Sequence, residues 1–422
     1  MREKLIYGLA AAGVVWGVWT AYEMAVPEPT DVLPERLSDP DSTPLAAVLA
    51  ASLGESVQEG NRVVPLTNGD EIFPAMLQAI REAEESISFL TYIYWTGDIA
   101  RVFAAEMSAA CRRGVEVRIL LDAVGAYKMD DALVERMRAA GCRVERFRPI
   151  HWYTIRRFNH RTHRRALVVD GRVGFTGGVG IAEEWTGDAE DPDHWRDQHF
   201  RLEGPVVRQI QGAFAENWRE VTGEVLSGRR HYPDLPPAGE ATVVPVLGAP
   251  GGSISKTAFT YWLMLQHAER TVHVSTPYFA PDPDLVEAIL AAARRGVAVT
   301  LLLPGEHADY AIVRWAGRSY YAELLDAGVR IHEYTPTMMH VKAFTVDGEW
   351  AVIGTANFDS RSFELNFELV LAVEDAGLAA SLDERFAEDL ARSRRITPEE
   401  VEAWPWHVRM RDHLASGLRE QI

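Results

Sequence analysis

MHVKAFTVDGEWAVIGTANFDSRSFELNFE, from Met339 to Glu368, is the stretch that decides the fold. Its VKAFTV run combines apolar and β-branched residues and stops at an Asp-Gly pair, which predicts a buried strand followed by a tight turn. Because alternate side chains of a strand share a face, His340 and Lys342 are predicted to lie side by side. An imidazole beside an ammonium suits a phosphate, since the cation binds the oxygens while a neutral ring nitrogen can attack phosphorus.

Small residues follow this strand at fixed spacing. Asp347 completes the H-x-K-x4-D pattern that His340 begins, and the sequence G-T-A-N opens seven residues later. Small residues let backbone donors approach an anion. A lone buried histidine is more often structural, but the combination of these groups favours a site. The predicted phosphate contacts of this segment are Gly354, Thr355, Asn357, Ser362 and Asn366.

The same pattern occurs earlier in the chain. The segment at 163–178, HRRALVVDGRVGFTGG, matches the segment at 340–355, HVKAFTVDGEWAVIGT. In both copies the Asp lies seven residues after the His. RRGVEVRILLD at 112–122 likewise reappears as RRGVAVTLLLP at 294–304. Two copies of one structural unit are therefore predicted. The candidate site residues of the first copy are His163, Arg165, Asp170, Gly177 and Gly178.

Strands and helices alternate along both copies, which predicts an α/β fold of two tandem α-β-α halves with a mainly parallel core sheet. If the halves pack about a pseudo-two-fold axis, His163 and His340 can face each other across one phosphate. One imidazole then attacks while the other protonates the leaving oxygen. When a second alcohol takes the place of the leaving one, the roles reverse: the imidazole that gave a proton now takes one, and the imidazole that attacked becomes the leaving group.

An apolar, uncharged run at 5–22 is long enough to cross a bilayer and is predicted to be an uncleaved transmembrane anchor. A cleaved secretory signal is the rival interpretation, but the run is long for one and lacks a clear cleavage site. Basic residues before it and acidic residues after it predict a single-pass protein of the cell membrane with an extracytoplasmic body. The remaining predicted segments are a linker at 23–59, a first half at 60–222, a linker at 223–242, a second half at 243–396 and an amphipathic tail at 397–422.

Three further segments have sequence patterns of their own. The first linker contains one short predicted helix near Leu45 to Leu53. The first copy has a ten-residue insertion before His163, and the aromatic and arginine residues between Ile150 and Phe158 suit either a lipid headgroup surface or a packed loop. The amphipathic tail either lies on a membrane or caps the second half.

The overall composition indicates which class of molecule the protein binds. A net charge of −18 on 422 residues speaks against nucleic acid and favours a small or lipid phosphate substrate. The two cysteines, Cys111 and Cys142, show no metal-ligand spacing and no disulfide framework, so both are predicted to be buried small residues. His160, His199 and His332 lie outside the repeat pattern and are predicted to be structural.

Each site histidine needs a partner that fixes its tautomer. Aligning the strands that follow the two motifs places Asp197 opposite Glu368, and these are the predicted orienting carboxylates. Glu184 is a rival of Asp197. Asp170 and Asp347 stand before the turns, where they either brace the strand ends or touch substrate.

Residues 60–396 resemble the phospholipase D superfamily, whose signature is the H-x-K-x4-D pattern present twice. Within that superfamily the similarity is to bacterial cardiolipin synthases, through strings more specific than the short signature. Those strings are G-N-R-V-x-x-L-T-N-G at 60–69, T-Y-I-Y-W at 91–95, W-R-D-Q-H at 195–199, T-P-Y-F at 276–279 and the run at 354–368.

Two residues depart from the family pattern. Arg165 stands where the family has Lys, and Gly180 stands where the second copy has Asn357. Arginine keeps a permanent charge and a bidentate fork for phosphate, but it is larger. Loss of an amide that acts as an oxyanion donor costs a factor of about 10² to 10³. The first half is therefore expected to be less effective in catalysis. In the extreme case the protein would be a non-catalytic lipid-binding protein.

The resemblance implies a phosphohistidine intermediate, neither metal nor cofactor, and phosphatidyl transfer between alcohols. Two phosphatidylglycerol molecules would give cardiolipin and glycerol. With water as acceptor the enzyme would be a phospholipase D hydrolase that releases phosphatidic acid, and a phosphodiesterase acting on nucleic acid uses the same signature. The usual pattern of the family implies that His163 is the nucleophile and His340 the acid. The complete second motif favours the opposite assignment, with His340 as nucleophile.

Overall fold

The computed structural model describes residues 33–34, 44–150, 158–251 and 255–418. The predicted anchor at 5–22 and most of the insertion before His163 lie outside the described residues. Across the part that is described, no helix is both long and apolar enough to cross a membrane.

The first half begins with a long strand and alternates helices with strands as predicted. Its elements are β1 (Gln58–Thr67), α3 (Asn68–Glu82), β2 (Ser86–Thr91), α4 (Asp98–Arg112), β3 (Glu116–Asp122), α5 (Asp131–Ala139), β4 (Arg143–Phe147), β5 (Ala166–Val169), β6 (Val173–Gly177), the short helix η2 (Glu183–Trp185), β7 (Gln198–Glu203) and α6 (Val207–Thr222).

The second half repeats this order after a join without regular structure. Its elements are β8 (Ala241–Gly248), α7 (Lys256–His267), β9 (Thr271–Ser275), β10 (Phe279–Ala280), α8 (Pro283–Arg294), β11 (Ala298–Pro304), α9 (Ala311–Arg318), α10 (Tyr321–Asp326), β12 (Arg330–Tyr334), β13 (Ala343–Val346), β14 (Trp350–Gly354), β15 (Phe358–Asp359), the π-turn η3 (Arg361–Leu365), β16 (Glu368–Glu374), α11 (Ala376–Ala391) and β17 (Ser393–Arg395).

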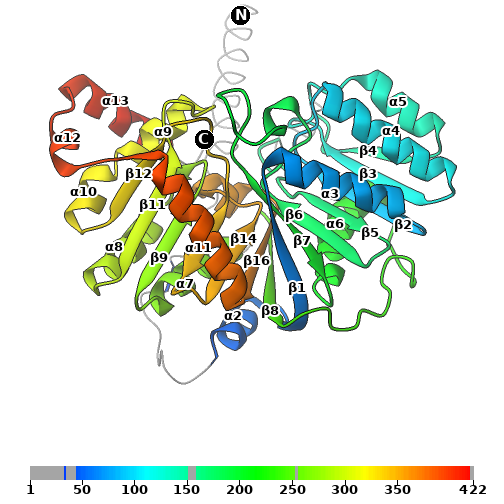
Figure 1. The fold of residues 1–422 in the computed structure, drawn as a ribbon, viewed down its shortest axis with the longest axis horizontal. Helices are drawn as coiled ribbons and strands as arrows, with labels where there is room; N and C mark the ends of the chain where they lie inside the picture. Colours follow the sequence, from blue (N-terminus) through cyan, green and yellow to red (C-terminus); the bar gives the residue numbers. More distant parts are fainter. Residues whose placement is uncertain (1–32, 35–43, 151–157, 252–254, 419–422) are drawn as a thin grey trace, which may run out of the picture.

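Among the described residues, 15 strands form one continuous sheet that runs through both halves, in the order β17-β12-β11-β9-β13-β14-β16-β8-β1-β7-β6-β5-β2-β3-β4. The order is nearly symmetric about the β8–β1 pair at its centre, where the halves join (Figure 1). The predicted pair of tandem α/β halves is therefore confirmed.

The prediction of a mainly parallel sheet is wrong. Only the outer strands β2, β3 and β4, and their counterparts β9, β11 and β12, pair in parallel. The strands between them are antiparallel, because Asp-Gly turns connect β5 to β6 and β13 to β14 as hairpins. Helical crossovers, which parallel pairing requires, occur only at the outer edges.

Helices cover both faces of the sheet in each half (Figure 1). On β3, Ile119 packs with α3, α4 and α5, whereas its neighbour Leu120 packs with α6. The α6 core continues across the join, since Phe214 of α6 belongs to the same cluster as Leu371 of β16 and Leu382 of α11. One apolar core therefore holds the two halves in a fixed relation.

The globular body begins before Gly60, where the sequence placed its start. The predicted short helix is confirmed as α2 (Leu45–Leu53), but α2 is not part of a free tether. Leu45 and Leu49, one turn apart, are buried in the core of the second half with residues of α7. An apolar i, i+4 pair explains this docking, because it gives the helix one face to bury.

The prediction that the two cysteines are separate buried residues is also wrong. Cys111 and Cys142 form a disulfide, with their Cα atoms 5.6 Å apart. The bond joins the end of α4 to the residue before β4. The two positions are 31 residues apart in sequence, and the packing of α4 against α5 and β3 brings them together.

Candidate active site

Both site histidines lie in extended segments just before strands, and not within the strands as predicted. β5 begins at Ala166 and β13 at Ala343, after the His-x-Arg and His-x-Lys triplets. The alternation expected of a strand nevertheless holds, because Arg165 Nη1 lies 3.0 Å from His163 Nε2 and Lys342 Nζ lies 3.3 Å from His340 Nε2. Each imidazole therefore has its own cation.

Main-chain hydrogen bonds tie each histidine segment to the other half. The backbone N–H of His163 donates to the carbonyl of Phe367 at 3.0 Å, and the N–H of His340 donates to the carbonyl of Arg196 at 2.8 Å. Each contact belongs to an isolated parallel bridge, Thr162 with Phe367 and Arg196 with Met339. The two halves are thus joined twice, in the same way, at the site.

The side chains cross between the halves as well. Nδ1 of His163 lies 2.8 Å from Oε1 of Glu368 in the second half. Nδ1 of His340 lies 2.7 Å from Oδ2 of Asp197 in the first half. A carboxylate at Nδ1 keeps the proton there and leaves Nε2 as the free base, which is the tautomer a nucleophilic imidazole needs.

Both orienting carboxylates are held in turn. Thr355 Oγ1 donates to Glu368 Oε2 at 2.5 Å, while Trp185 Nε1 donates to Asp197 Oδ2 at 2.8 Å. A Cβ at Gly178 would collide with the Asp197 carboxylate, so only glycine allows this close approach. Thr355 and Gly178, predicted as phosphate contacts, therefore contact the carboxylates.

Electrostatics keep both imidazoles neutral. Burial lowers the pKa of His163 to about 4 and that of His340 to about 3, and the adjacent cations lower both further against the pull of the carboxylates. Burial likewise lowers the pKa of Lys342 to about 7. Although burial alone raises the pKa of Asp197 and Glu368, the partner imidazoles and cations hold both below their usual values. The site thus offers two free bases beside two cations.

One cavity of about 340 Å³ is lined by both histidines. Arg165, Asn357 and Asn366 line it too, among the residues predicted from sequence. Within the described residues, Arg165 Nε, Asn357 Oδ1 and Asn366 Oδ1 are buried without a hydrogen-bond partner. Buried polar groups normally find a partner, so these three have unused capacity for a bound group.

Other predicted site residues do not line this cavity. Asp170 accepts from the backbone N–H groups of Glu84, Glu85 and Ser86, just before and at the start of β2. Asp347 accepts in the same way from three N–H groups, those of residues 269–271, at β9. Both aspartates, at φ near 54°, brace turns rather than face the cavity.

The glycines and Ser362 also act within the protein. Gly177 and Gly354 have φ of 150° and 138°, and a Cβ at either would meet the neighbouring strand. Ser362 Oγ accepts from the backbone N–H of Asn357 at 3.1 Å and so shapes the loop that presents this amide. Glu184 contacts neither histidine in any hydrogen bond or ion pair of the described residues, and Asp197 is the partner of His340.

The sequence analysis did not single out the walls of the cavity. His163 meets the ring of Tyr92 edge-on at 5.2 Å, and His340 lies 5.1 Å from Trp185 and 5.4 Å from Trp195. Tyr278 lines another wall and donates to Asp309 at 2.7 Å. Tyr92, Trp195 and Tyr278 stand in the family-specific strings, which were the available signal. The two copies carry different residue types at such positions, since aligning Asp197 with Glu368 places Trp195 opposite Asn366, so the repeat could not reveal them.

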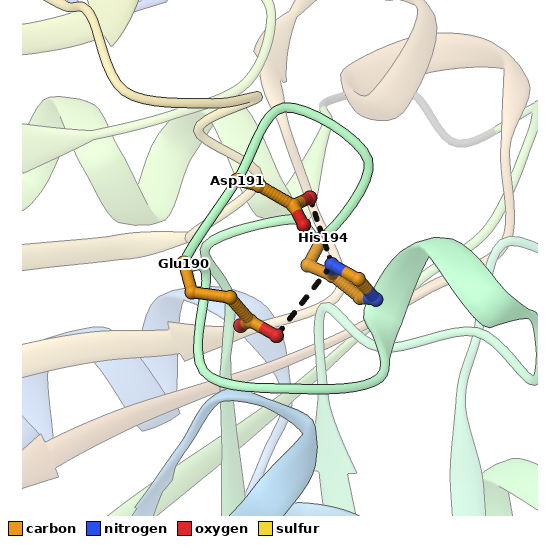
Figure 2. Close-up of side chains that lie close together, drawn as sticks. All are labelled: Glu190, Asp191 and His194. Carbon is orange, nitrogen blue, oxygen red and sulfur yellow. Dashed lines mark hydrogen bonds and ion pairs between the residues drawn. The ribbon is translucent and has the colours of Figure 1, made fainter.

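An ion-pair cluster closes the loop between the two tryptophans. Figure 2 shows His194 between Asp191 and Glu190, with Nδ1 at 2.8 Å and 3.6 Å from their carboxylates. Partial burial lowers the pKa of His194, but the hydrogen bond to Asp191 and the negative charges of Asp191, Glu190 and Asp193 together outweigh it and raise the pKa overall. These contacts fasten the loop between Trp185 and Trp195, whose rings lie 4.5 Å apart and both stand close to His340.

Two neutral imidazoles, two cations and one shared cavity are the groups that phosphoryl transfer through histidine needs. A family model described as "Cardiolipin synthase, PLD-like domain" matches residues 76–215 and 262–390. The chain therefore belongs to this family of phospholipase D-like enzymes.

Relatives and solved structures agree with this assignment. The cardiolipin synthase of Geobacillus kaustophilus is 36% identical over 396 residues, which are 93% of this chain and 78% of that protein. The major cardiolipin synthase of Bacillus subtilis is 33% identical, covering 85% of this chain and 75% of that protein. In fold, the chain is similar to the phosphatidylserine synthase of Haemophilus influenzae, with a TM-score of 0.67, 12% identity and coverage of 89% and 100% of the two chains.

Proposed function

We propose that the protein is a membrane-tethered cardiolipin synthase that converts two phosphatidylglycerol molecules into cardiolipin and glycerol. The observation that carries this proposal is the reciprocal pairing of His163 with Glu368 and of His340 with Asp197 around one cavity. Such an arrangement provides one imidazole as nucleophile and a second as acid and then as base, which a two-step transfer between two alcohols requires.

In the first step, Nε2 of His163 attacks the phosphorus of the first lipid. A P–N bond forms, the P–O bond to the glycerol headgroup breaks, and His340, protonated when the anionic lipid binds, gives its proton to the leaving oxygen. Arg165 and Lys342 neutralise the non-bridging oxygens. The choice of His163 as nucleophile follows the family resemblance.

In the second step, neutral His340 removes a proton from the glycerol hydroxyl of another phosphatidylglycerol. That oxygen attacks phosphorus, the P–N bond breaks, and cardiolipin leaves with His163 restored. Asn357 and Asn366 line the path of the phosphate and have unused hydrogen-bonding capacity. The residues of this chain supply every group that these steps need, so we expect neither a metal nor a cofactor.

The relatives' printed names support the lipid product, since several are cardiolipin synthases that align over most of their length. We further propose that residues 5–22 anchor the protein and that its body lies outside the cytoplasm. The Cys111–Cys142 disulfide supports this placement, because disulfides persist mainly in oxidising compartments. Alkylation of the cysteines in intact cells with a membrane-impermeant reagent, before and after treatment with an impermeant reductant, tests this placement. Labelling is expected only after reduction. Free cysteine thiols that only a membrane-permeant reagent can reach would contradict an extracytoplasmic body.

Lipid products from phosphatidylglycerol vesicles give the direct test of function. Purified full-length protein should produce cardiolipin and glycerol in equal amounts. Phosphatidic acid as the main product would replace the transferase by a hydrolase. No turnover, with binding retained, would leave a lipid-binding protein.

Trapping of the intermediate tests the two histidine roles. With lipid labelled at phosphorus, His340→Asn should accumulate label on histidine, because the acid and base for turnover are missing while the nucleophile remains. His163→Asn should trap none. His332→Asn is the matched control, since His332 lies on β12 away from the cavity, and it should behave as the parent protein. Label retained by His163→Asn would reverse the assignment.

A further inference from the structure

The C-terminal helix α13 (Trp406–Ser416) presents an apolar stripe to solvent. Trp406, Met410, Leu414 and Leu418 follow at intervals of four residues and are 69%, 50%, 65% and 48% exposed. At that spacing Trp406, Met410 and Leu414 share one face of the helix, and Leu418 lies in the turn that follows its end at Ser416. An exposed row of large apolar residues on a soluble surface marks an interaction site.

The opposite side of α13 is fixed to the protein, so this outward orientation is built in. Ala415 packs in one cluster with Val313 and Ala316 of α9. Asp412, which is buried, is 3.6 Å from Arg318, and Arg411 lies over the ring of Trp315 at 4.4 Å. The helix therefore cannot turn its apolar stripe inward without breaking these contacts.

The stripe lies next to the mouth of the candidate active site. Ile312 and Val313 of α9 line the cavity, and the same Val313 contacts the cluster of Ala415 from α13. Tyr310, just before α9, also lines the cavity while it is 61% exposed. Figure 1 shows α9 and α13 side by side, with α12 (Pro398–Glu402) leading into α13.

Charge distinguishes among possible occupants. Arg409, which is exposed, borders the stripe and carries a permanent positive charge. Cations beside an apolar stripe that contains tryptophan are typical of helices lying at an anionic lipid surface. A net charge of −18 gives the rest of the protein no such attraction to anionic lipid.

We infer that α13 is the bilayer-docking element: its stripe of Trp406, Met410, Leu414 and Leu418 enters the headgroup region of an anionic membrane and holds the cavity mouth against the lipid. This inference rests on the proposed function, because it assumes a substrate that arrives from a bilayer. Docking shortens the path of a phosphatidyl headgroup from the membrane into the cavity, whose α9 wall is the helix that α13 packs against.

A fluorophore on Met410→Cys tests docking in the full-length protein. The two natural cysteines are bonded to each other, so the introduced thiol is the reactive one. Val225→Cys is the matched control: Val225 is 70% exposed, and its neighbour Glu224 pairs with Arg118 and Arg143 near the starts of β3 and β4, far from the cavity. In phosphatidylglycerol vesicles with brominated acyl chains, the label at 410 should be quenched and blue-shifted, and the label at 225 should not.

Equal responses at the two positions, or none at 410, would overturn the inference. So would a blue shift at 410 without vesicles that grows with protein concentration, since a second copy of the chain would then cover the stripe. This readout does not depend on turnover, so it stands or falls separately from cardiolipin synthesis.

Kinetics give a second readout. The double variant Trp406→Ser with Leu414→Ser should raise the apparent KM for phosphatidylglycerol vesicles about tenfold. It should leave kcat/KM for monomeric short-chain phosphatidylglycerol unchanged. An equal loss on both substrates would assign the residues to support of α9 and contradict a docking role.

Discussion

The two halves of the site share one geometry but differ at three matching positions: the orienting carboxylate, the cation beside the histidine and the amide of the small-residue motif. Each histidine takes a carboxylate from the opposite half, yet His163 pairs with Glu368 and Arg165 whereas His340 pairs with Asp197 and Lys342. The cation of the first half is permanently charged, while the pKa of Lys342 falls to about 7 because of burial. The halves are therefore equivalent in geometry and unequal in electrostatics.

The small-residue motifs differ for a steric reason. Asn357 lines the cavity in the second half, whereas its counterpart is Gly180. A Cβ at Gly180 would lie 2.6 Å from Cβ of Ile93, so this position has no room for an amide. The first half has not simply lost a contact, because the side chains of Ile93 and Trp185 fill the space beside Gly180.

Removal of the orienting carboxylates should have the largest effect. Glu368→Gln and Asp197→Asn should each lower kcat by about 10³ to 10⁴, because the wrong histidine tautomer is then favoured. Steady-state cardiolipin synthesis measures this, with circular dichroism to confirm folding. Because the carboxylates cross between halves, the double variant should be little worse than either alone, and additive losses would mean that the halves work independently.

Deletion of the Asn357 amide should come next. Asn357→Gly, which copies the first half, should lower kcat/KM by about 10² if the amide binds the phosphate oxygens. The reverse change, Gly180→Asn, should gain nothing and should lower stability by about 1 to 3 kcal/mol through collision with Ile93. Gly212→Ala on α6, where no atom lies within 4 Å of the added Cβ, is the control and should not destabilise.

The unequal cations predict an unequal pH response. Lys342, with its pKa near 7, is protonated below that pH and neutral above it, so kcat/KM for an anionic lipid should fall as pH rises through 7. Asp359 adds to this fall, because burial raises its pKa to about 7 and it becomes negative over the same range. Lys342→Arg should reduce the fall and Arg165→Lys should steepen it. Identical profiles for all three proteins would remove the proposed role of the charge on Lys342.

The two bracing aspartates should show the smallest effect on activity. Asp170→Ala and Asp347→Ala each remove the acceptor of three backbone N–H groups, so each should lower the free energy of unfolding by about 1 to 3 kcal/mol. Activity per folded molecule should stay within about twofold. Thermal denaturation measures stability, and titration of active protein measures activity per folded molecule. A large loss of kcat with normal stability would mean that the two aspartates take part in catalysis.

Much of the site was accessible from sequence because the chain repeats itself. The matched spacing of histidine, cation and glycine identified His163, His340 and their cations without any structure. Alignment of the two copies also paired Asp197 with Glu368. Tyr92 and Trp185 line the cavity, but the two copies do not match in residue type at these positions, so the comparison did not reveal them.

The sequence alone determined the two α/β halves, the duplicated histidine motif and the family, since local periodicity and internal repetition are properties of order along the chain. Only the tertiary structure decided that each carboxylate serves the histidine of the other half, that Cys111 meets Cys142, and that the central strands run antiparallel. The physical reason is that these contacts join residues far apart in sequence, through a shared core between α6, β16 and α11 that no local pattern encodes.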